Sequence, residues 1–283
     1  MNETATQKAD ESGTSAPPEP VDLPCRACGN PIECPNPADL GFVAAWNAMA
    51  DKPPRLTCEP CRIAEAQVRT DAHAHALDDQ RQAMLATVRA DPQRALASCG
   101  VPEHWLGADL DECPDLPTRL IDTARRWAER PDGLLLLYGP PGAGKTWTAV
   151  GVLRAILTAG TLAPGSCRYV SERRFLDGAK AAFDHDVPNR ALPETHPRRI
   201  PLLLYDDLAA CRMTDWAKGE IAGLLEARHA EDLPTIITSN LSPHGLAAAI
   251  DARTSSRISE SRMMLKFPTR DLRTLGAATT EGR

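Results

Sequence analysis

The sequence LLLLYGPPGAGKTWTAV contains the residues of a phosphate-binding loop. Gly139, Gly144, Lys145 and Thr146 match the spacing G-x-x-x-x-G-K-[ST], with Gly142 inside the loop. Glycines allow the backbone N–H groups of such a loop to turn toward phosphate oxygens, and the following helix adds its positive N-terminal dipole. We expect Lys145 to reach the β- and γ-phosphates of a nucleotide, and the Thr146 hydroxyl to bind Mg²⁺.

The segments around this motif favour a phosphate loop over an ordinary Gly/Pro turn. A β-like run, Leu134 to Tyr138, precedes it and a helix-like run, Thr146 to Thr158, follows it, which is the context that the motif requires. The predicted nucleotide-binding residues are Gly139, Pro140, Pro141, Gly142, Ala143, Gly144, Lys145, Thr146, Trp147 and Asp206.

Two adjacent carboxylates, Asp206 and Asp207, end the apolar run in PLLLYDDLA. Such a run is typical of a buried strand, and a strand ending at Asp206 would bring a carboxylate beside the Mg²⁺ at the carboxyl edge of a sheet. Asp207 would then face the γ-phosphate and orient or deprotonate the attacking water. A bound cation offsets the repulsion between the two carboxylates. The alternatives are an Asp-Asp turn and, for the base, a distant Glu.

Two further segments supply candidate catalytic residues. The β-branched run LPTIITSNLS ends near Asn240, which we expect to hold the lytic water or to sense the γ-phosphate; strand-terminal turn chemistry is the alternative. Arg253 and Arg257 are four residues apart and would share one face of a helix. Either would match phosphate oxygens as an arginine finger given to a neighbouring subunit, unless both are plain surface arginines.

Two cysteine pairs near the N-terminus have the spacing of a zinc site. Cys25-x-x-Cys28 and Cys58-x-x-Cys61 are separated by 29 residues, and two such pairs complete a tetrahedral shell of four thiolates. Cys34 is a spare that could replace one ligand, and His73 or His75 is a more remote alternative. The segment has few large apolar residues, so it needs a staple to fold, and we expect structural zinc rather than a core of free thiols.

Composition narrows the class of protein. A formal charge of −6 argues against a surface coated in basic residues. The N-terminal residues have no apolar stretch of the kind found in signal peptides, and no run of 18 apolar residues occurs. We therefore expect a cytoplasmic protein with no membrane association, in which clustered cysteines bind metal rather than form disulfides.

The chain divides by composition into four segments. We expect a disordered tail over 1–22, a cysteine-rich zinc-binding module over 23–61, a solvated helical connector over 62–98 that is interrupted near Pro92, and a nucleotide-binding domain over 99–283. In the last segment short apolar runs alternate with helix-like segments, which predicts an α/β fold with a parallel sheet.

The motifs GPPGAGKT, LLLYDDL, WAKGEIAGLLEARHAEDLPTIITSNLS and SSRISESRMMLKFPTRDLR resemble those of the DnaC/IstB-like AAA+ ATPases, over about residues 99–275. This group comprises bacterial and phage helicase loaders and transposition helper ATPases. The resemblance implies a P-loop AAA+ core in which Lys145 and Thr146 are Walker A, Asp206 and Asp207 Walker B, Asn240 sensor 1, and Arg257 the finger, with Arg253 as second choice.

The end of the sequence departs from a full AAA+ architecture. Sixteen residues follow Phe267, too few for a lid of several helices at roughly 11 residues each. We therefore expect no full helical lid, and Arg273 is the candidate to replace a lid arginine.

The resemblance implies an ATP-hydrolysing helicase loader that binds ATP, Mg²⁺ and Zn²⁺, assembles as a homo-oligomer with ATP, and delivers a replicative helicase to single-stranded DNA. The first alternative is a transposition helper ATPase of the IstB type. A small P-loop kinase or GTP-dependent switch is a further alternative, but the chain has no N-K-x-D motif for guanine. An adaptor that binds ATP without hydrolysing it is the last. Residues 253–283 contain seven Lys or Arg and three Asp or Glu, a basic stretch suited either to phosphates or to solvent.

Overall fold

The computed structural model describes residues 23–25, 27–32, 58–112, 116–184, 195–250, 263–269 and 272. Contacts divide the chain into two units, Met1–Gln80 and Arg81–Arg283. The two cysteine pairs fall in the first unit and the phosphate loop falls in the second. The predicted tail, 1–22, lies outside the described residues, as do the residues Cys34, Arg253, Arg257 and Arg273.

In the described part of the second unit, five strands form a sheet in the order β4-β5-β6-β3-β7. They are β3 (Leu134–Tyr138), β4 (Cys167–Ser171), β5 (Leu202–Leu208), β6 (Thr235–Ser239) and β7 (Met263–Lys266). Every neighbouring pair is parallel. All the carboxyl ends therefore lie at one edge, where open α/β sheets bind ligands. The predicted α/β fold with a parallel sheet is confirmed.

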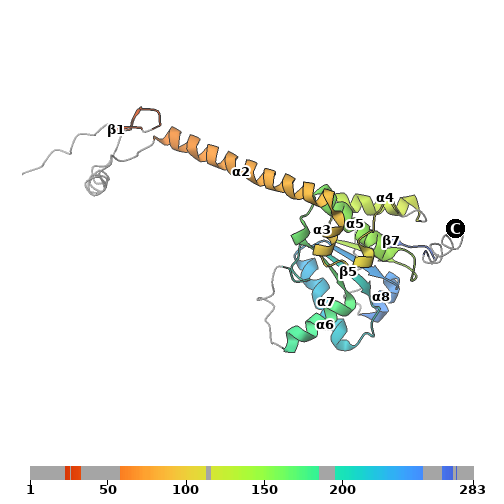
Figure 1. Ribbon diagram of the computed structural model, residues 1–283. Helices are drawn as coiled ribbons and strands as arrows, with labels where there is room; N and C mark the ends of the chain where they lie inside the picture. The colour runs from red at the N-terminus through yellow and green to blue at the C-terminus, as the bar shows by residue number, and fades with distance from the viewer. Residues whose placement is uncertain are drawn as a thin grey trace, which may run out of the picture. The chain divides into compact units, whose positions relative to one another are not determined.

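Helices cover both faces of this sheet (Figure 1). One layer contains α3 (Pro92–Ser98), α4 (Thr118–Glu129) and α5 (Lys145–Ala159), and the other contains α6 (Glu172–Asp184), α7 (Asp215–Ala230) and α8 (Pro243–Ala249). Because successive side chains of a strand point to opposite faces, Leu135 and Leu137 pack with the first layer and Leu136 packs with the second. Two short 3-10 helices lie in the connections: η1 (Glu103–Trp105) between α3 and α4, and η2 (Pro164–Ser166) between α5 and β4.

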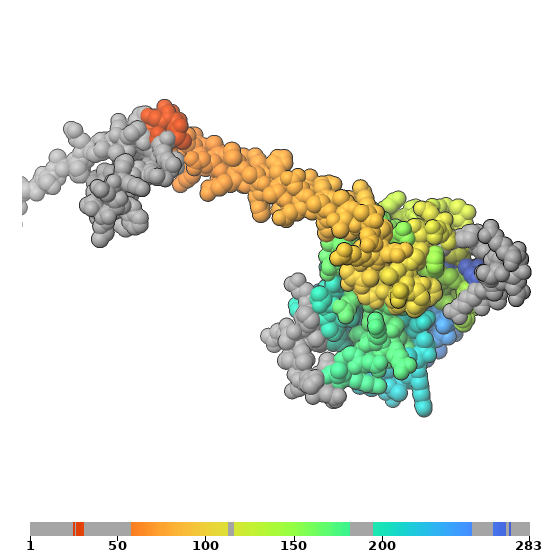
Figure 2. Space-filling model, viewed as in Figure 1, coloured from red at the N-terminus to blue at the C-terminus, as the bar shows by residue number. Residues whose placement is uncertain are grey.

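The long helix α2 (Glu59–Ala90) is exposed along most of its length. Every side chain from 62 to 83 is exposed, and Figure 2 shows this stretch in orange, uncovered on the face in view. Leu85 and Val88 are buried near its end. Asp91 ends α2 and caps α3, because its carboxylate accepts a 2.9 Å hydrogen bond from the backbone N–H of Arg94. No helix in the described part of the chain, α2 included, is long and apolar enough to cross a bilayer.

Candidate nucleotide-binding site and metal centre

The phosphate loop joins the end of β3 to the start of α5. Gly139, Gly142 and Gly144 have φ angles of +150°, +75° and +90°, in a region that residues with a Cβ rarely adopt. At Gly139 a Cβ would also lie 2.9 Å from the Cβ of Phe267. The loop can take this path only because glycine occupies these positions.

The Lys145 side chain is buried within the loop rather than extended into solvent, with 6% of its surface exposed. Its ammonium donates hydrogen bonds to the carbonyl oxygens of Gly139 and Pro140 at 2.9 and 2.8 Å, and to Asn240 Oδ1 at 2.8 Å. Asn240 follows the last residue of β6, and β6 lies beside β3 in the sheet. The structure therefore brings the predicted lysine and the predicted sensor together.

Asp206 lies on β5, and the residue is 4% exposed. Its Oδ1 accepts hydrogen bonds from the hydroxyls of Thr146, at 2.9 Å, and Thr238, at 2.6 Å. Its Oδ2 accepts one from the Tyr169 hydroxyl at 2.6 Å. Burial and the nearby Asp206 carboxylate raise the pKa of Tyr169, so the phenol stays protonated and serves as a donor. The predicted pair of Mg²⁺ ligands, Thr146 and Asp206, is thus in direct contact.

Asp207 occupies a bulge in β5. The strand does not end at Asp206, as the sequence had led us to expect, but continues to Leu208. The register with β6 shifts between Tyr205 and Leu208, so Asp206 and Asp207 share the space opposite Thr238. Asp207 adopts φ +61°, a conformation that aspartate tolerates better than most residues, and its backbone N–H donates to Thr238 Oγ1 at 2.9 Å. Bulges of this kind redirect side chains near active sites. Here Asp206 is buried, whereas Asp207 is exposed.

The backbone that follows Asp207 is held by a buried acid. Glu172, at the start of α6 and 1% exposed, accepts hydrogen bonds from the backbone N–H groups of Ala209, at 2.5 Å, and Cys211, at 2.7 Å. Ser239 donates from its hydroxyl to the carbonyl of Leu208 at 2.7 Å. These contacts fix the loop that carries the candidate base. Glu172, Tyr169 and Thr238 were not predicted from sequence: Glu172 and Tyr169 belong to no motif, and Thr238 lies in the segment that ends near Asn240 but was given no role.

The remaining predicted loop residues lie around the lysine. Pro140 and Pro141 are in the loop, and Ala143 is fully buried. Trp147 lies in the first turn of α5, and its indole N–H donates to the Asp109 carbonyl at 3.0 Å. Trp147 thereby ties α5 to the segment that precedes α4.

The segment after β7 also packs on the loop. The backbone N–H of Leu272 donates to the Gly142 carbonyl at 2.9 Å, and that of Phe267 donates to the Tyr138 carbonyl at 2.8 Å. A Cβ on Gly144 would lie 3.1 Å from the Leu272 side chain and 3.5 Å from that of Leu116. Apolar side chains from two distant segments therefore meet beside the N-terminus of α5.

Comparisons with known proteins give relatives among replication proteins. The replicative helicase loader DnaI of Bacillus subtilis (strain 168) is 32% identical over 164 residues, which cover 54% of this chain and 50% of DnaI. The crystal structure of the DnaC helicase loader matches with a TM-score of 0.52 and 24% identity, over 59% of this chain and 100% of that one. A crystal structure of a DNA replication initiation factor matches with a TM-score of 0.50 and 15% identity, over 62% of this chain and 54% of that one. No family model matches the chain.

The core of this chain is similar in sequence to the helicase loader DnaI and has the fold of the DnaC helicase loader. The match to DnaI spans only half the length of that relative, and the two structural matches show the fold of the core. Within this core, the residues expected at Walker A, Walker B and sensor 1 lie at the same edge of the sheet, joined by the Lys145–Asn240 and Thr146–Asp206 hydrogen bonds.

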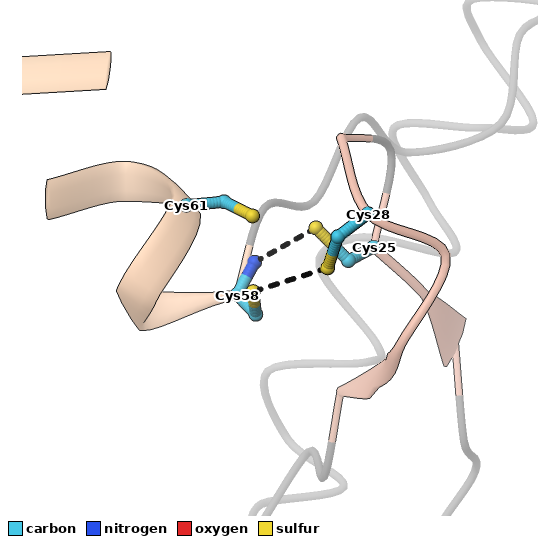
Figure 3. Close-up of side chains that lie close together, drawn as sticks. All are labelled: Cys25, Cys28, Cys58 and Cys61. Carbon is cyan, nitrogen blue, oxygen red and sulfur yellow. Dashed lines mark hydrogen bonds between the residues drawn. The ribbon is translucent and has the colours of Figure 1, made fainter. Parts of the chain in front are cut away.

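Outside this core, the four predicted zinc ligands form one cluster (Figure 3). Cys25 and Cys28 come from the turn between β1 (Leu23–Pro24) and β2 (Pro31–Ile32), a pair of antiparallel strands. Cys58 immediately precedes α2 and Cys61 lies in its first turn, which the 3.0 Å hydrogen bond from the Arg62 N–H to the Cys58 carbonyl joins to Cys58. The turn closes with a 2.8 Å hydrogen bond from the N–H of Gly29 to the Cys25 carbonyl.

The spacing of the sulfurs suits a tetrahedral metal. All four Sγ atoms lie within 4.8 Å of one another, and those of Cys28 and Cys58 are 3.7 Å apart. Four thiolates bound to zinc at about 2.3 Å would be about 3.8 Å apart. Hydrogen bonds from the backbone N–H groups of Cys58 and Cys28 lower the pKa of the Cys25 thiol to about 6, whereas the neighbouring thiols of Cys58 and Cys28 raise that of Cys61. The four thiols thus influence one another's ionisation, and a bound cation would favour the thiolate form of all of them.

Proposed function

We propose that this chain is an ATP-hydrolysing helicase loader, which delivers a replicative helicase to single-stranded DNA. The observation that carries the proposal is the joint placement of Lys145, Thr146, Asp206 and Asn240 at one sheet edge in a core similar to that of DnaI. A nucleotide triphosphate is the ligand that needs a lysine, a Mg²⁺ ligand pair and a polar sensor in one site.

The donor set fits Mg²⁺-ATP. The loop backbone and Lys145 would bind the phosphates, and the Thr146 hydroxyl and the Asp206 carboxylate supply the hard oxygen ligands that Mg²⁺ prefers. When bound, Mg²⁺ neutralises charge on the phosphate oxygens. Asp207, exposed on its bulge, orients and deprotonates the attacking water, while Asn240 holds that water against the γ-phosphate.

Hydrolysis on this account needs a second copy of the chain. Arg257, with Arg253 as the second choice, would act as a finger in the site of a neighbouring subunit, because a planar guanidinium stabilises charge on the transferring phosphoryl group. The chain would therefore form a homo-oligomer with ATP, in the cytoplasm. This part of the proposal rests on the sequence resemblance, since both arginines lie outside the described residues.

The cysteine cluster would hold one structural zinc ion. Four sulfur ligands leave no open coordination position for chemistry, so the ion would stabilise the folded module. The surface of that module would then be the part that contacts a partner. We assign that surface to helicase recruitment. A transposition helper of the IstB type remains the competing function, and it is favoured if the recruited partner is a transposase.

Co-purification tests the proposal. A tagged chain is mixed with the replicative helicase of the same organism, with ATP, with ADP and without nucleotide. We expect the helicase to be retained, most strongly with ATP, and to be lost with Cys28→Ser/Cys61→Ser. The control variant Cys211→Ser changes a cysteine outside the cluster and should retain it. If the helicase were retained under none of the three conditions, the loader assignment would be contradicted.

A further inference from the structure

Both oxygens of the Asp206 carboxylate are engaged by hydroxyl groups. Thr146 and Thr238 donate to Oδ1, and Tyr169 alone among the described residues donates to Oδ2, at 2.6 Å. Thr146 belongs to the phosphate loop motif, whereas Tyr169 belongs to no motif and Thr238, two residues before Asn240, was given no role from the sequence. Their hydroxyls reach the same carboxylate from the two strands that flank β5, so Asp206 is held from both sides.

The sheet register explains why the Tyr169 hydroxyl reaches this carboxylate. Ser171 on β4 pairs with Asp206, and Tyr169 pairs with Leu204. Residues two apart on a strand share a face, so the Tyr169 and Asp206 side chains lie on the same face of the sheet. The long phenol ring then spans the two-residue offset along the strand.

The backbone of Tyr169 is anchored as well. β4 is an edge strand of the described sheet, and edge strands leave one row of backbone groups without a strand partner. Here the N–H of Tyr169 donates to the Cys99 carbonyl at 2.8 Å. The ring is 5% exposed. The hydroxyl therefore has little freedom to leave Asp206.

Packing alone would not require this hydroxyl, because phenylalanine would fill the same space. The next strand supplies a comparison: Tyr205 on β5 is 1% exposed, packs edge-to-face against Phe175, and has a hydroxyl without a hydrogen-bond partner among the described residues. Both tyrosines are buried, yet only Tyr169 is directed at a predicted metal ligand. This difference separates a role in positioning from a role in packing.

We propose that Tyr169 is a positioning residue, which together with Thr238 fixes the Asp206 carboxylate in the orientation that receives the nucleotide-bound Mg²⁺. The inference rests on the proposed ATP site and adds a residue to it. A carboxylate rotates easily about its Cβ–Cγ bond, so a donor on Oδ2 and another on Oδ1 restrict that rotation before the cation arrives. Loss of such supporting contacts typically lowers metal affinity about 10- to 100-fold.

The test measures binding of a fluorescent ATP analogue as a function of Mg²⁺ concentration, without turnover. Tyr169→Phe should need about 10-fold or more Mg²⁺ for half-maximal enhancement of nucleotide affinity, while its affinity in EDTA stays within twofold of the parent. Thr238→Val, which removes the opposing hydroxyl, should shift the Mg²⁺ midpoint in the same direction. Tyr205→Phe is the matched control and should leave both quantities unchanged.

Three outcomes would overturn the inference. The first is a Tyr169→Phe variant with the parental Mg²⁺ midpoint and parental thermal unfolding. The second is the same midpoint with a lowered unfolding temperature, which would make Tyr169 a packing residue only. In the third, the parent itself binds no nucleotide at any Mg²⁺ concentration, and the proposed function then fails together with the inference that rests on it.

Discussion

The ammonium of Lys145 and the side-chain carbonyl of Asn240 lie 2.8 Å apart, although the residues are 95 positions apart in sequence. The contact joins the phosphate loop to the end of β6, so the lysine and the sensor cannot move independently. A nucleotide phosphate that binds Lys145 must replace the hydrogen bonds of the Lys145 ammonium to the loop carbonyls and to Asn240. A change of Lys145 should therefore affect mainly ATP binding, and a change of Asn240 should affect mainly turnover.

Lys145→Ala should weaken ATP binding about 10- to 100-fold, because a hydrogen bond to a charged group contributes roughly 1.5–3 kcal/mol. Asn240→Ala should lower turnover and leave affinity within a few-fold, since it leaves the lysine in place. Fluorescence titration and steady-state ATPase assays measure the two effects. Lys218→Ala, on α7 and paired with Asp215 at 3.8 Å, is the control. Parental affinity in Lys145→Ala would refute the assignment of the loop.

Asp207→Asn should bind ATP normally and lose turnover by a factor of about 10² to 10⁴, the usual contribution of a general base. Asparagine tolerates the φ of +61° at this position, so the variant removes the charge without straining the bulge. Asp232, also exposed and at φ +49°, provides the matched control as Asp232→Asn. If Asp207→Asn hydrolysed ATP at the parental rate, a different residue would be the base.

Arg257→Ala should abolish most hydrolysis, because the loss of an arginine finger costs about 10³ to 10⁵ in rate. Mixing Arg257→Ala chains with Lys145→Ala chains should restore part of the activity, since one supplies an intact pocket and the other supplies the arginine. The exposed Arg173 gives a control as Arg173→Ala. The model in which the finger acts in trans fails if mixing restores nothing and specific activity does not depend on protein concentration.

Purified chain should contain one zinc ion, measured by elemental analysis. Cys28→Ser/Cys61→Ser should lose it and become sensitive to proteolysis within residues 23–61, because zinc binding and folding are coupled in small sites, by about 10 to 16 kcal/mol in comparable peptides. The ATP site lies in the other unit and should still bind nucleotide. Protein prepared without chelators that holds no zinc would rule out the metal centre.

Acid should destabilise the second unit through His196. Burial, followed by the nearby Arg198 and Arg168 charges, lowers the pKa of His196 to about 4, and its Nδ1 accepts a 3.2 Å hydrogen bond from the Arg198 N–H. The unfolded chain binds this proton near pH 6.5, so protonation favours unfolding as pH falls from about 6.5 toward 4.

Because His196 is only partly buried, we expect a loss of about 1–2 kcal/mol after discounting for solvent screening. Urea unfolding at pH 7, 5.5 and 4.5 measures it. His196→Asn retains an acceptor and should reduce the pH dependence, whereas the exposed His104→Asn should not. If the free energy of unfolding depended on pH equally in the parent and both variants, the assignment to His196 would be refuted.

The sequence predicted the elements whose signals are local. The apolar run of β3 and the glycine spacing after it were recognised because a buried strand and a phosphate loop each leave a pattern within one short segment. The parallel sheet followed from the alternation of such runs with helical segments. The cysteine pairs were found for the same reason, since both have a fixed spacing.

The residues that the sequence did not predict depend on register and burial. Tyr169 meets Asp206 only because of how β4 pairs with β5, and Thr238 meets it because Ile237, the residue before it, pairs with Tyr205, the residue before Asp206. Glu172 and Arg228 are charged residues that belong to no local pattern, and both are 1% exposed. Glu172 is satisfied by backbone N–H groups, and Arg228 by Thr235 and the carbonyls near the start of β5. These partners are distant in sequence and no local pattern marks them, so the sequence alone does not select them.

The most direct test of the loader assignment is the transfer of the organism's replicative helicase onto circular single-stranded DNA, measured as DNA-bound helicase after gel filtration. The account predicts that this chain with ATP raises the DNA-bound fraction severalfold, that Lys145→Ala does not, and that Cys28→Ser/Cys61→Ser does not although it still binds ATP. The same DNA-bound fraction with and without this chain, in the presence of ATP, would contradict it.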